Sequence, residues 1–250
     1  MMDTILLKEQ YKIVRVLELQ EHFAAVHAVD ITSRSNDQCI INIYDGELLK
    51  PYIGYYSGLV NFAGYKGMFV RDESLAAVFS FRDGEEIDRV FFRGNKVKSS
   101  ECIDYADQLF KLTLSVSDQP PEIICPLLLS RQLRFVKAEK GFVFHAVVVP
   151  TEGMNQREMA LLLRDQILKL LCVKFDTVWA VRCYVRELKH AEVRSVVQLY
   201  TRWCEVRKSM KREAEKLDSS GFVNRVVHLL WLNIKDVYYN LADNRKAGGQ

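Results

Sequence analysis

Apolar and polar residues alternate along much of the first hundred residues, which is the period of β-strands with one buried face. Polar turn residues separate the alternating runs, as in Ser-Arg-Ser-Asn-Asp at positions 33–37. The predicted strands are Tyr11 to Leu17, His22 to Asp30, Cys39 to Tyr44, Gly67 to Arg71 and Leu75 to Arg82. Residues 48–64, which include Pro51, predict either a poor helix or a loop.

The period changes to three and four residues after Ser99, which is typical of amphipathic helices. A first helix starts at Ser100 and is stopped by Pro120-Pro121. Short strands are then predicted at Pro126 to Leu129, Arg134 to Val136 and Gly141 to Val149. Further helices are predicted at about 156–173, 177–189, 190–217 and 221–241.

These elements predict an α+β protein in two parts. Residues 1–99 form a β-rich N-terminal lobe, and residues 100–243 form a mostly helical C-terminal lobe with one β-hairpin. Residues 244–250 are polar and glycine-rich, and we expect a flexible tail there.

Composition places the chain among ordinary globular proteins. Of 250 residues, 49% are hydrophobic and 27% charged, which excludes a fully disordered or collagen-like chain. The net charge of +3 is too small to indicate a nucleic-acid partner by itself. Six cysteines occur without a Cys-x-x-Cys pair, so we expect a reducing cytoplasm, no disulfides and no zinc site. No targeting sequence and no apolar run of about 20 residues is visible, so we expect no transmembrane segment.

The order of elements over about residues 10–150 resembles the protein kinase fold. The best local match is Leu75 to Phe92, which looks like a kinase's fifth strand, the hinge at Phe81 to Gly84 and the following helix. Phe23 to Val26 lies where the second kinase strand follows the glycine-rich loop, and the helix from Ser100 resembles the long central helix of the C-terminal lobe. The resemblance implies that the hairpin after Pro120-Pro121 replaces the catalytic and metal-binding loops.

The residues that carry phosphoryl transfer in kinases are missing at the matching positions. The glycine-rich loop is replaced by Glu-Leu-Gln-Glu-His at 18–22, and Asn42 stands at the strand-three lysine. No carboxylate occurs at 124–129, and Phe-His-Ala-Val at 144–147 replaces the metal-binding motif.

The resemblance therefore implies a catalytically inactive kinase-like module, a pseudokinase. We expect no nucleotide or metal cofactor and a role as a scaffold or adaptor for protein partners. Two alternatives stay open: a divergent kinase-fold enzyme or nucleotide-binding protein without the usual motifs, and a plain α+β interaction domain.

Four other groups of residues suggest chemistry, and each also has a plain structural interpretation that we favour. His145 is read as a strand histidine rather than a base or ligand. Cys125 is read as a core thiol rather than a nucleophile. The paired acids at 83–86 follow an Asp-Gly turn. His22 and His27 are five residues apart on one predicted strand, so they point to opposite faces and cannot share a metal.

Four tyrosines cluster where the kinase regulatory helix would lie. They are Tyr52, Tyr55, Tyr56 and Tyr65. They either dock a partner, because tyrosine gives contact area at low entropy cost, or cover the sheet.

Residues 182–216 are basic, with ten Lys and Arg against five Glu, an excess of +5. We favour a solvated helix face over a nucleic-acid or lipid surface, because Glu residues are interleaved and no aromatic residues accompany the charges in the manner of single-strand binding.

The helix from about 190 to 217 carries one apolar stripe that is longer than a small lobe is wide. We predict that its second half docks a partner protein or a second copy of the chain. Trp203 and Met210 would be the apolar anchors, and Lys211 and Arg212 part of the basic rim. The alternative is that the last helix folds back over this stripe through Val226, Val227, Leu230 and Ile234.

Overall fold

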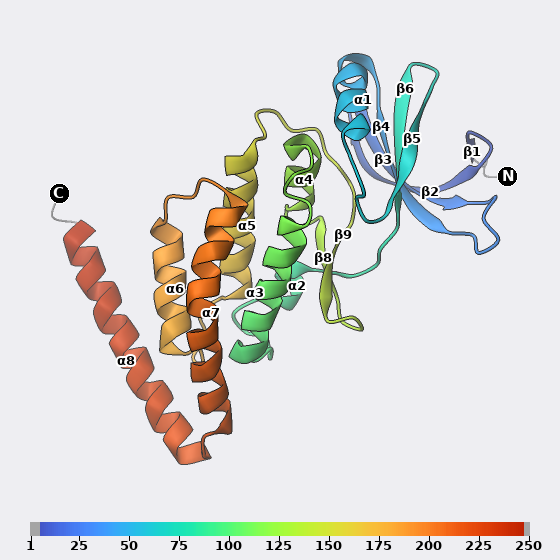
Figure 1. Cartoon of the computed structure of the whole chain (residues 1–250). Helices are drawn as coiled ribbons and strands as arrows, with labels where there is room; N and C mark the ends of the chain where they lie inside the picture. The colour runs from blue at the N-terminus through green and yellow to red at the C-terminus, as the bar shows by residue number, and fades with distance from the viewer. Residues whose placement is uncertain (1–5, 248–250) are drawn as a thin grey trace.

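The structure, a computed structural model, describes residues 6–247, with a sheet at one end and helices at the other (Figure 1). The sheet is antiparallel, with strand order β1-β2-β3-β4-β6-β5. Its strands are β1 (Leu6–Leu7), β2 (Tyr11–Gln20), β3 (Phe23–Asp30), β4 (Gln38–Tyr44), β5 (Tyr65–Arg71) and β6 (Ser74–Ser80). The five predicted strands are confirmed, because a period of two residues marks a strand with one buried face.

The two faces of the sheet bury different side chains. On β4, Ile40, Asn42 and Tyr44 face the helices, whereas Cys39 and Ile41 belong to a smaller cluster on the other face. In that smaller cluster the sheet is curved, so that the ring of Tyr11 on β2 stacks on the ring of Phe69 on β5 with centroids 6.3 Å apart. The side chains facing the helices therefore join one core that continues through the helical part.

The first part of residues 48–64 is a helix and the rest a loop: α1 spans Leu49–Ser57 after a single 3-10 turn, η1 (Gly46–Leu48), and residues 58–64 form neither helix nor strand. Pro51 lies in the first turn of α1, where backbone N–H groups have no intrahelical partner. The buried residues of α1, Tyr52 and Tyr56, cover the sheet. Tyr56 stacks with Tyr65 at 5.8 Å, whereas Tyr55 is only partly buried and lines a surface pocket.

The helical part surrounds the long helix α3 and carries one small sheet of order β7-β8-β9. Its strands are β7 (Glu85–Glu86), β8 (Leu133–Val136) and β9 (Gly141–Phe144). Its helices are α2 (Ile87–Val90), α3 (Ser99–Leu114), α4 (Pro121–Leu127), α5 (Gln156–Leu170), α6 (Trp179–His190), α7 (Val196–Ser219) and α8 (Phe222–Ala247). This confirms an α+β protein with an N-terminal antiparallel sheet and a mostly helical C-terminal part.

The strand predicted at Pro126 to Leu129 is wrong, because the chain is helical through Leu127 in α4. Every residue of this run is apolar, so no period distinguishes a buried strand from a buried helix. Pro121 occupies the first turn of α4, where proline is tolerated, so the proline pair starts this helix. It does not stop the preceding helix, as the sequence predicts, because α3 already ends at Leu114 and turns follow at residues 115–118.

Two helix boundaries also differ from the prediction. The chain breaks between His190 and Val196, and α7 starts after Ser195, whose Oγ accepts the Gln198 N–H at 3.2 Å. The last helix continues to Ala247, inside the segment predicted as a flexible tail, whose residues 248–250 lie outside the described part. Among the described helices, none contains a stretch long and apolar enough to cross a bilayer.

Candidate functional site

Asn42 lies where the sheet meets the segment after β9. Its neighbours on the adjacent strands are Ala25 and Ala77, which are fully buried and leave room for the amide. The Asn42 Nδ2 donates to the Ala146 carbonyl at 2.8 Å, and its Oδ1 accepts the Val148 N–H at 2.9 Å. One buried side chain therefore satisfies two backbone groups that come more than a hundred residues later.

Tyr44, two residues further along β4, extends this contact. Its hydroxyl donates to the Val148 carbonyl at 2.7 Å and lies 2.8 Å from the hydroxyl of Tyr56 on α1. Its ring stacks on Tyr52 at 3.9 Å. Burial raises the pKa of both the Tyr44 and Tyr56 phenols well above the usual value, so these groups stay neutral.

The segment at 145–149, predicted as part of a strand, has no strand pairing beyond Phe144. Ala146 adopts a left-handed backbone conformation with φ 58°, which costs free energy for a residue with a Cβ. The Asn42 amide holds the carbonyl of this same residue. The side chains of β4 thus fix the path of 146–148 against the sheet.

The kinase resemblance places Asn42 at the lysine position and 144–147 at the metal-binding motif. The structure brings these two places together, but through neutral amide, phenol and backbone groups. The resemblance places the glycine-rich loop at residues 18–22, which cover the end of β2 and the β2–β3 turn; on β2, Glu18 forms an ion pair with Arg131 at 3.6 Å.

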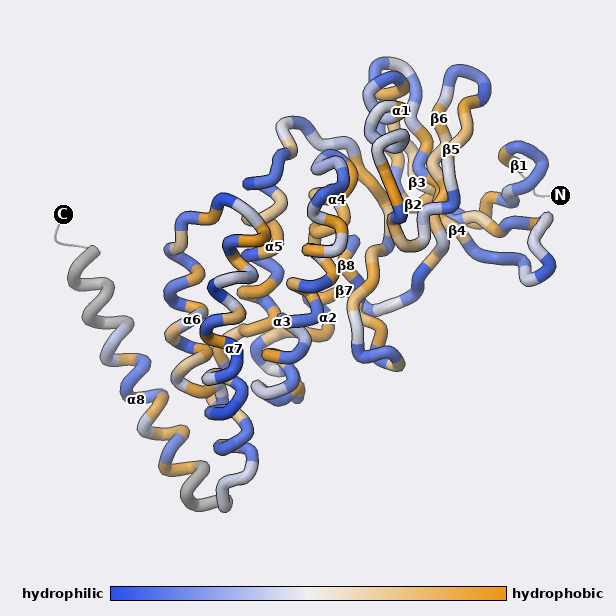
Figure 2. The backbone as a smooth tube through the Cα atoms, viewed as in Figure 1, coloured by the Kyte–Doolittle hydropathy of each residue, from blue (hydrophilic) through white to orange (hydrophobic). Residues whose placement is uncertain are grey.

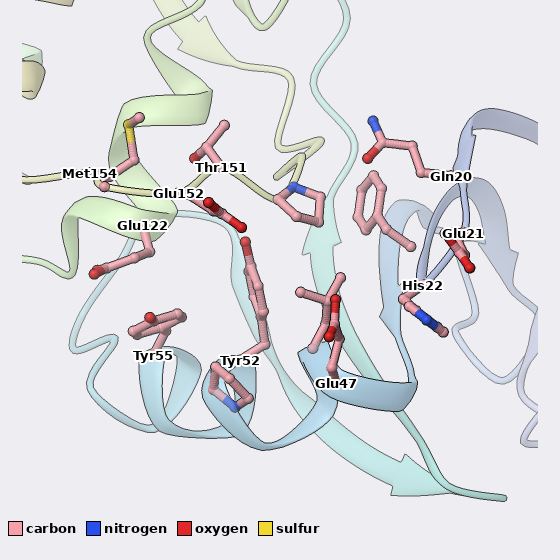
Figure 3. A pocket seen from close by; sticks show the side chains of 15 residues that line it. Gln20, Glu21, His22, Glu47, Tyr52, Tyr55, Glu122, Thr151, Glu152 and Met154 are labelled. Carbon is pink, nitrogen blue, oxygen red and sulfur yellow. The ribbon is translucent and has the colours of Figure 1, made fainter.

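A pocket of about 510 Å³ opens beside this contact, between the β2–β3 turn, α1 and residues 150–154 (Figure 3). Four carboxylates line it, from Glu21, Glu47, Glu122 and Glu152, and none of its described lining residues is Lys or Arg. The rings of Tyr52 and Tyr55 form part of its wall. Such a lining disfavours a phosphate and favours a cation, which can also lie over the aromatic rings.

His22 marks one rim of this pocket. Its Nδ1 lies 2.8 Å from Asp45 Oδ1, and this hydrogen bond raises the pKa of the imidazole above its usual value. The ring packs against Gly46 so closely that a Cβ there would lie 2.7 Å from the imidazole, at a φ of +52° that already favours glycine. The imidazole is therefore already paired with Asp45. Among the residues whose side chains the structure describes, no three His, Cys, Asp or Glu are grouped to hold a metal ion.

The other chemical candidates have structural partners. Burial raises the pKa of the Cys125 thiol to about 12, so it is not an activated nucleophile. Glu85 pairs with Lys137 at 2.6 Å and Glu86 with Arg134 at 3.2 Å. These two acids therefore tie β7 to the hairpin.

His145 packs against the ring of Phe81, with ring centroids 5.8 Å apart. Its pKa is lowered to about 4, first by burial and then by the nearby cations Arg134 and Arg15 and the neighbouring His27. It is therefore neutral near pH 7, which favours packing over a role as a base. It is not the strand histidine that the sequence predicts, because β9 ends one residue earlier, at Phe144.

The His145 pKa makes stability depend on pH. The pKa of His145 in the folded protein is below its unfolded value of about 6.5, so the unfolded chain takes up the proton first as pH falls. The contribution of neutral His145 to the free energy of unfolding is therefore complete above about pH 6.5 and is lost as pH falls toward 4. We expect a loss of roughly 1 kcal/mol by about pH 5.5. Urea unfolding across this range measures it, and His145→Gln, which stays neutral, should flatten the curve. An unchanged slope in that variant would assign the effect to other groups.

Trp203 and Met210 are fully buried, so the prediction that they anchor a partner is wrong. α7 packs along α3, where Trp203 Nε1 donates to Asp107 Oδ1 at 3.0 Å and Arg207 also pairs with Asp107. The partner helix comes a hundred residues earlier, so the pattern of α7 alone could not reveal it. The one sequence feature that could have indicated this packing is Asp107, an acid within the apolar stripe of α3 that needs a polar partner on another helix.

The two residues of the predicted basic rim have different surroundings. Lys211 pairs with Asp104 of α3 at 2.6 Å, and Arg212 is exposed.

The alternative prediction, that α8 covers the apolar stripe of α7, is also wrong as stated, because Val227, Leu230 and Ile234 are exposed.

No protein-family model matches this chain, and no curated protein matches it either.

Proposed function

We propose that this chain is a catalytically inactive kinase-like module that acts as a protein-binding scaffold or adaptor. The observation that carries the proposal is the use of Asn42. At the position where a kinase lysine would pair with phosphates, its amide is committed to the backbone of Ala146 and Val148. The order of elements, with α1 between the third and fourth strands of the resemblance, supports the same proposal.

The surroundings of this contact argue against phosphoryl transfer. A kinase holds phosphates with glycine backbone amides and a lysine, and it holds Mg²⁺ with carboxylates. Here the β2–β3 turn carries Glu21, and the adjacent pocket carries three more glutamates with no lysine or arginine among its described residues. A triphosphate would therefore be repelled where it would need compensation.

In the proposed role, the acid-lined pocket is the place where a basic side chain of a partner binds. An arginine or lysine can enter between the carboxylates of Glu47, Glu122 and Glu152 and lie near the ring of Tyr55. An arginine is the better fit, because its planar fork can donate to two carboxylates at once.

The proposal is tested by measuring the melting temperature with Mg-ATP and with a short arginine-rich peptide. Mg-ATP at millimolar concentration is expected to cause no shift and no phosphotransfer to itself or to a generic substrate. A clear Mg-ATP shift that Asn42→Ala abolishes would contradict the proposal, because ligands that bind the folded state raise its stability.

Peptide binding is measured by fluorescence anisotropy at low salt. Glu122→Gln with Glu152→Gln is expected to weaken binding about tenfold, whereas Glu215→Gln, an exposed acid on α7, should have no effect. Equal weakening by both variants would mean that only the net charge matters, and the pocket would then have no role.

A further inference from the structure

α8 presents two different faces. Toward the body it buries Leu229 and Leu232, which are 5% and 1% exposed. Two polar residues face the same way: Asn233 donates to the Phe175 carbonyl at 3.0 Å, and Asp236 accepts from Arg182 at 3.0 Å and from Arg186 at 2.8 Å. Figure 1 shows α8 at the outer end of the helical part, on the far side from the sheet.

The opposite face of α8 is apolar and open. Six large side chains on it are half or more exposed: Val227, Leu230, Trp231, Ile234, Val237 and Tyr238. They recur in steps of three and four residues, so they form one stripe along the helix, and Figure 2 shows hydrophobic positions recurring along it. A continuous exposed stripe of this kind, unlike scattered surface apolar residues, marks an interaction surface.

The ion pairs of Asp236 fix the direction of this stripe. The side chain of Arg182 is 2% exposed, and it also donates to the carbonyls of Thr177, Lys174 and Phe175. Turning α8 to bury its stripe would leave this guanidinium buried without its carboxylate, which is costly. The packing of the polar side of α8 on Arg182 therefore makes the apolar stripe face outward in the single chain.

We propose that a second copy of the chain covers this stripe, with the two α8 helices packed antiparallel. The apolar positions 227, 230, 234 and 237 have the alternating spacing of a helix–helix seam. An antiparallel pair with Val227 opposite Val237 and Leu230 opposite Ile234 repeats each contact twice, as a two-fold interface requires.

Charge does not oppose this pairing. The six residues of the stripe are uncharged, and the ammonium of the adjacent Lys235 lies 4.0 Å from the ring centre of Trp179 and 5.0 Å from that of Trp231. A lipid surface fits less well. Helices that lie on membranes expose Lys and Arg on the face opposite the apolar one, whereas here that face packs on the protein.

The area is sufficient for a dimer. Aromatic side chains carry about 150–250 Å² each, so at these exposures the stripe offers on the order of 600 Å² per copy. Two copies then bury on the order of 1,200 Å², the lower end for stable interfaces, which suits a dimer with a micromolar dissociation constant.

The experiment is sedimentation velocity on the full chain from about 1 to 100 µM, the range in which such a dimer forms. The wild type is expected to dimerise, and Ile234→Glu to remain monomeric with an unchanged melting temperature, since Ile234 is 70% exposed. Val197→Glu is the matched control, because Val197 is an equally aliphatic residue, 60% exposed, on α7. It should dimerise like the wild type.

The register has its own test. Leu230→Lys and Ile234→Glu are each expected to abolish the dimer, and the two combined are expected to restore it. Antiparallel packing places position 230 of one copy opposite position 234 of the other, so the introduced ammonium and carboxylate groups would pair across the interface.

Two results would overturn the proposal: a wild type that is monomeric throughout the range, and an Ile234→Glu protein that still dimerises. If the monomeric wild type also bound phosphatidylserine vesicles through this stripe, the occupant would be a lipid surface instead. Neither result depends on Mg-ATP or on the acidic pocket, so the inference and the proposed function fail separately.

Discussion

Asn42→Ala is expected to lower the free energy of unfolding by about 3 kcal/mol, or roughly 10 °C in melting temperature. The reason is that it leaves two buried backbone groups, the Ala146 carbonyl and the Val148 N–H, without partners. The alanine also removes the bond that holds Ala146 at its positive φ. Urea unfolding measures the loss.

A local measurement separates this mechanism from general loosening. Hydrogen exchange at the Val148 amide should accelerate in Asn42→Ala far more than exchange in the core of α3. Gln38→Ala, an exposed residue of the same strand, is the control and should change stability little. If the Val148 amide stayed protected in Asn42→Ala, the contact would not hold the segment.

Met210→Glu is expected to prevent stable folding, with a loss above about 4 kcal/mol. Met210 has no exposed surface and lies on the face of α7 that packs on α3, so the carboxylate would be buried without a partner. The neighbouring acid–base pairs, Asp104 with Lys211 and Asp107 with Arg207, are already formed and offer no free cation to it.

Arg212→Glu provides the comparison, since Arg212 is exposed two residues away and its replacement should cost less than about 0.5 kcal/mol. Circular dichroism melting of both proteins gives the answer. A Met210→Glu protein that melted like the wild type but lost an association would restore the docking role that the sequence pattern predicts for this residue.

The two proposed docking surfaces lie on different parts of the molecule. The acid-lined pocket is formed by the β2–β3 turn, α1 and residues 150–154, whereas the α8 stripe lies at the far end of the helical part (Figure 1). A dimer through α8 would leave both pockets open. A scaffold built in this way could hold two partner segments at once, and linked sites bind a bivalent partner more tightly than either does alone.

The amino-acid sequence by itself determined the five predicted strands of the large sheet and most of the helices. It also shows which residues stand at the positions that the kinase resemblance assigns to phosphoryl transfer. β4 is an example: positions 39, 41 and 43 belong to one face and 40, 42 and 44 to the other, so local spacing is enough to assign a strand and its buried sides. The neutral residue at 42 and the absence of glycine at 18–22 can also be read directly, because the type of residue at a position does not depend on what the residue contacts.

Only the tertiary structure decided what covers each apolar surface. The stripes of α7 and α8 look alike in sequence, yet Trp203 and Met210 are buried whereas Leu230 and Ile234 are exposed. Periodicity records that a helix has an apolar side, but burial depends on a partner element that is distant in sequence. For α7 that partner is α3, joined through Asp107, and for α8 the buried Arg182 selects the polar side through Asp236. The bonds from Asn42 to residues 146 and 148 have the same origin, since a long-range contact leaves no local pattern.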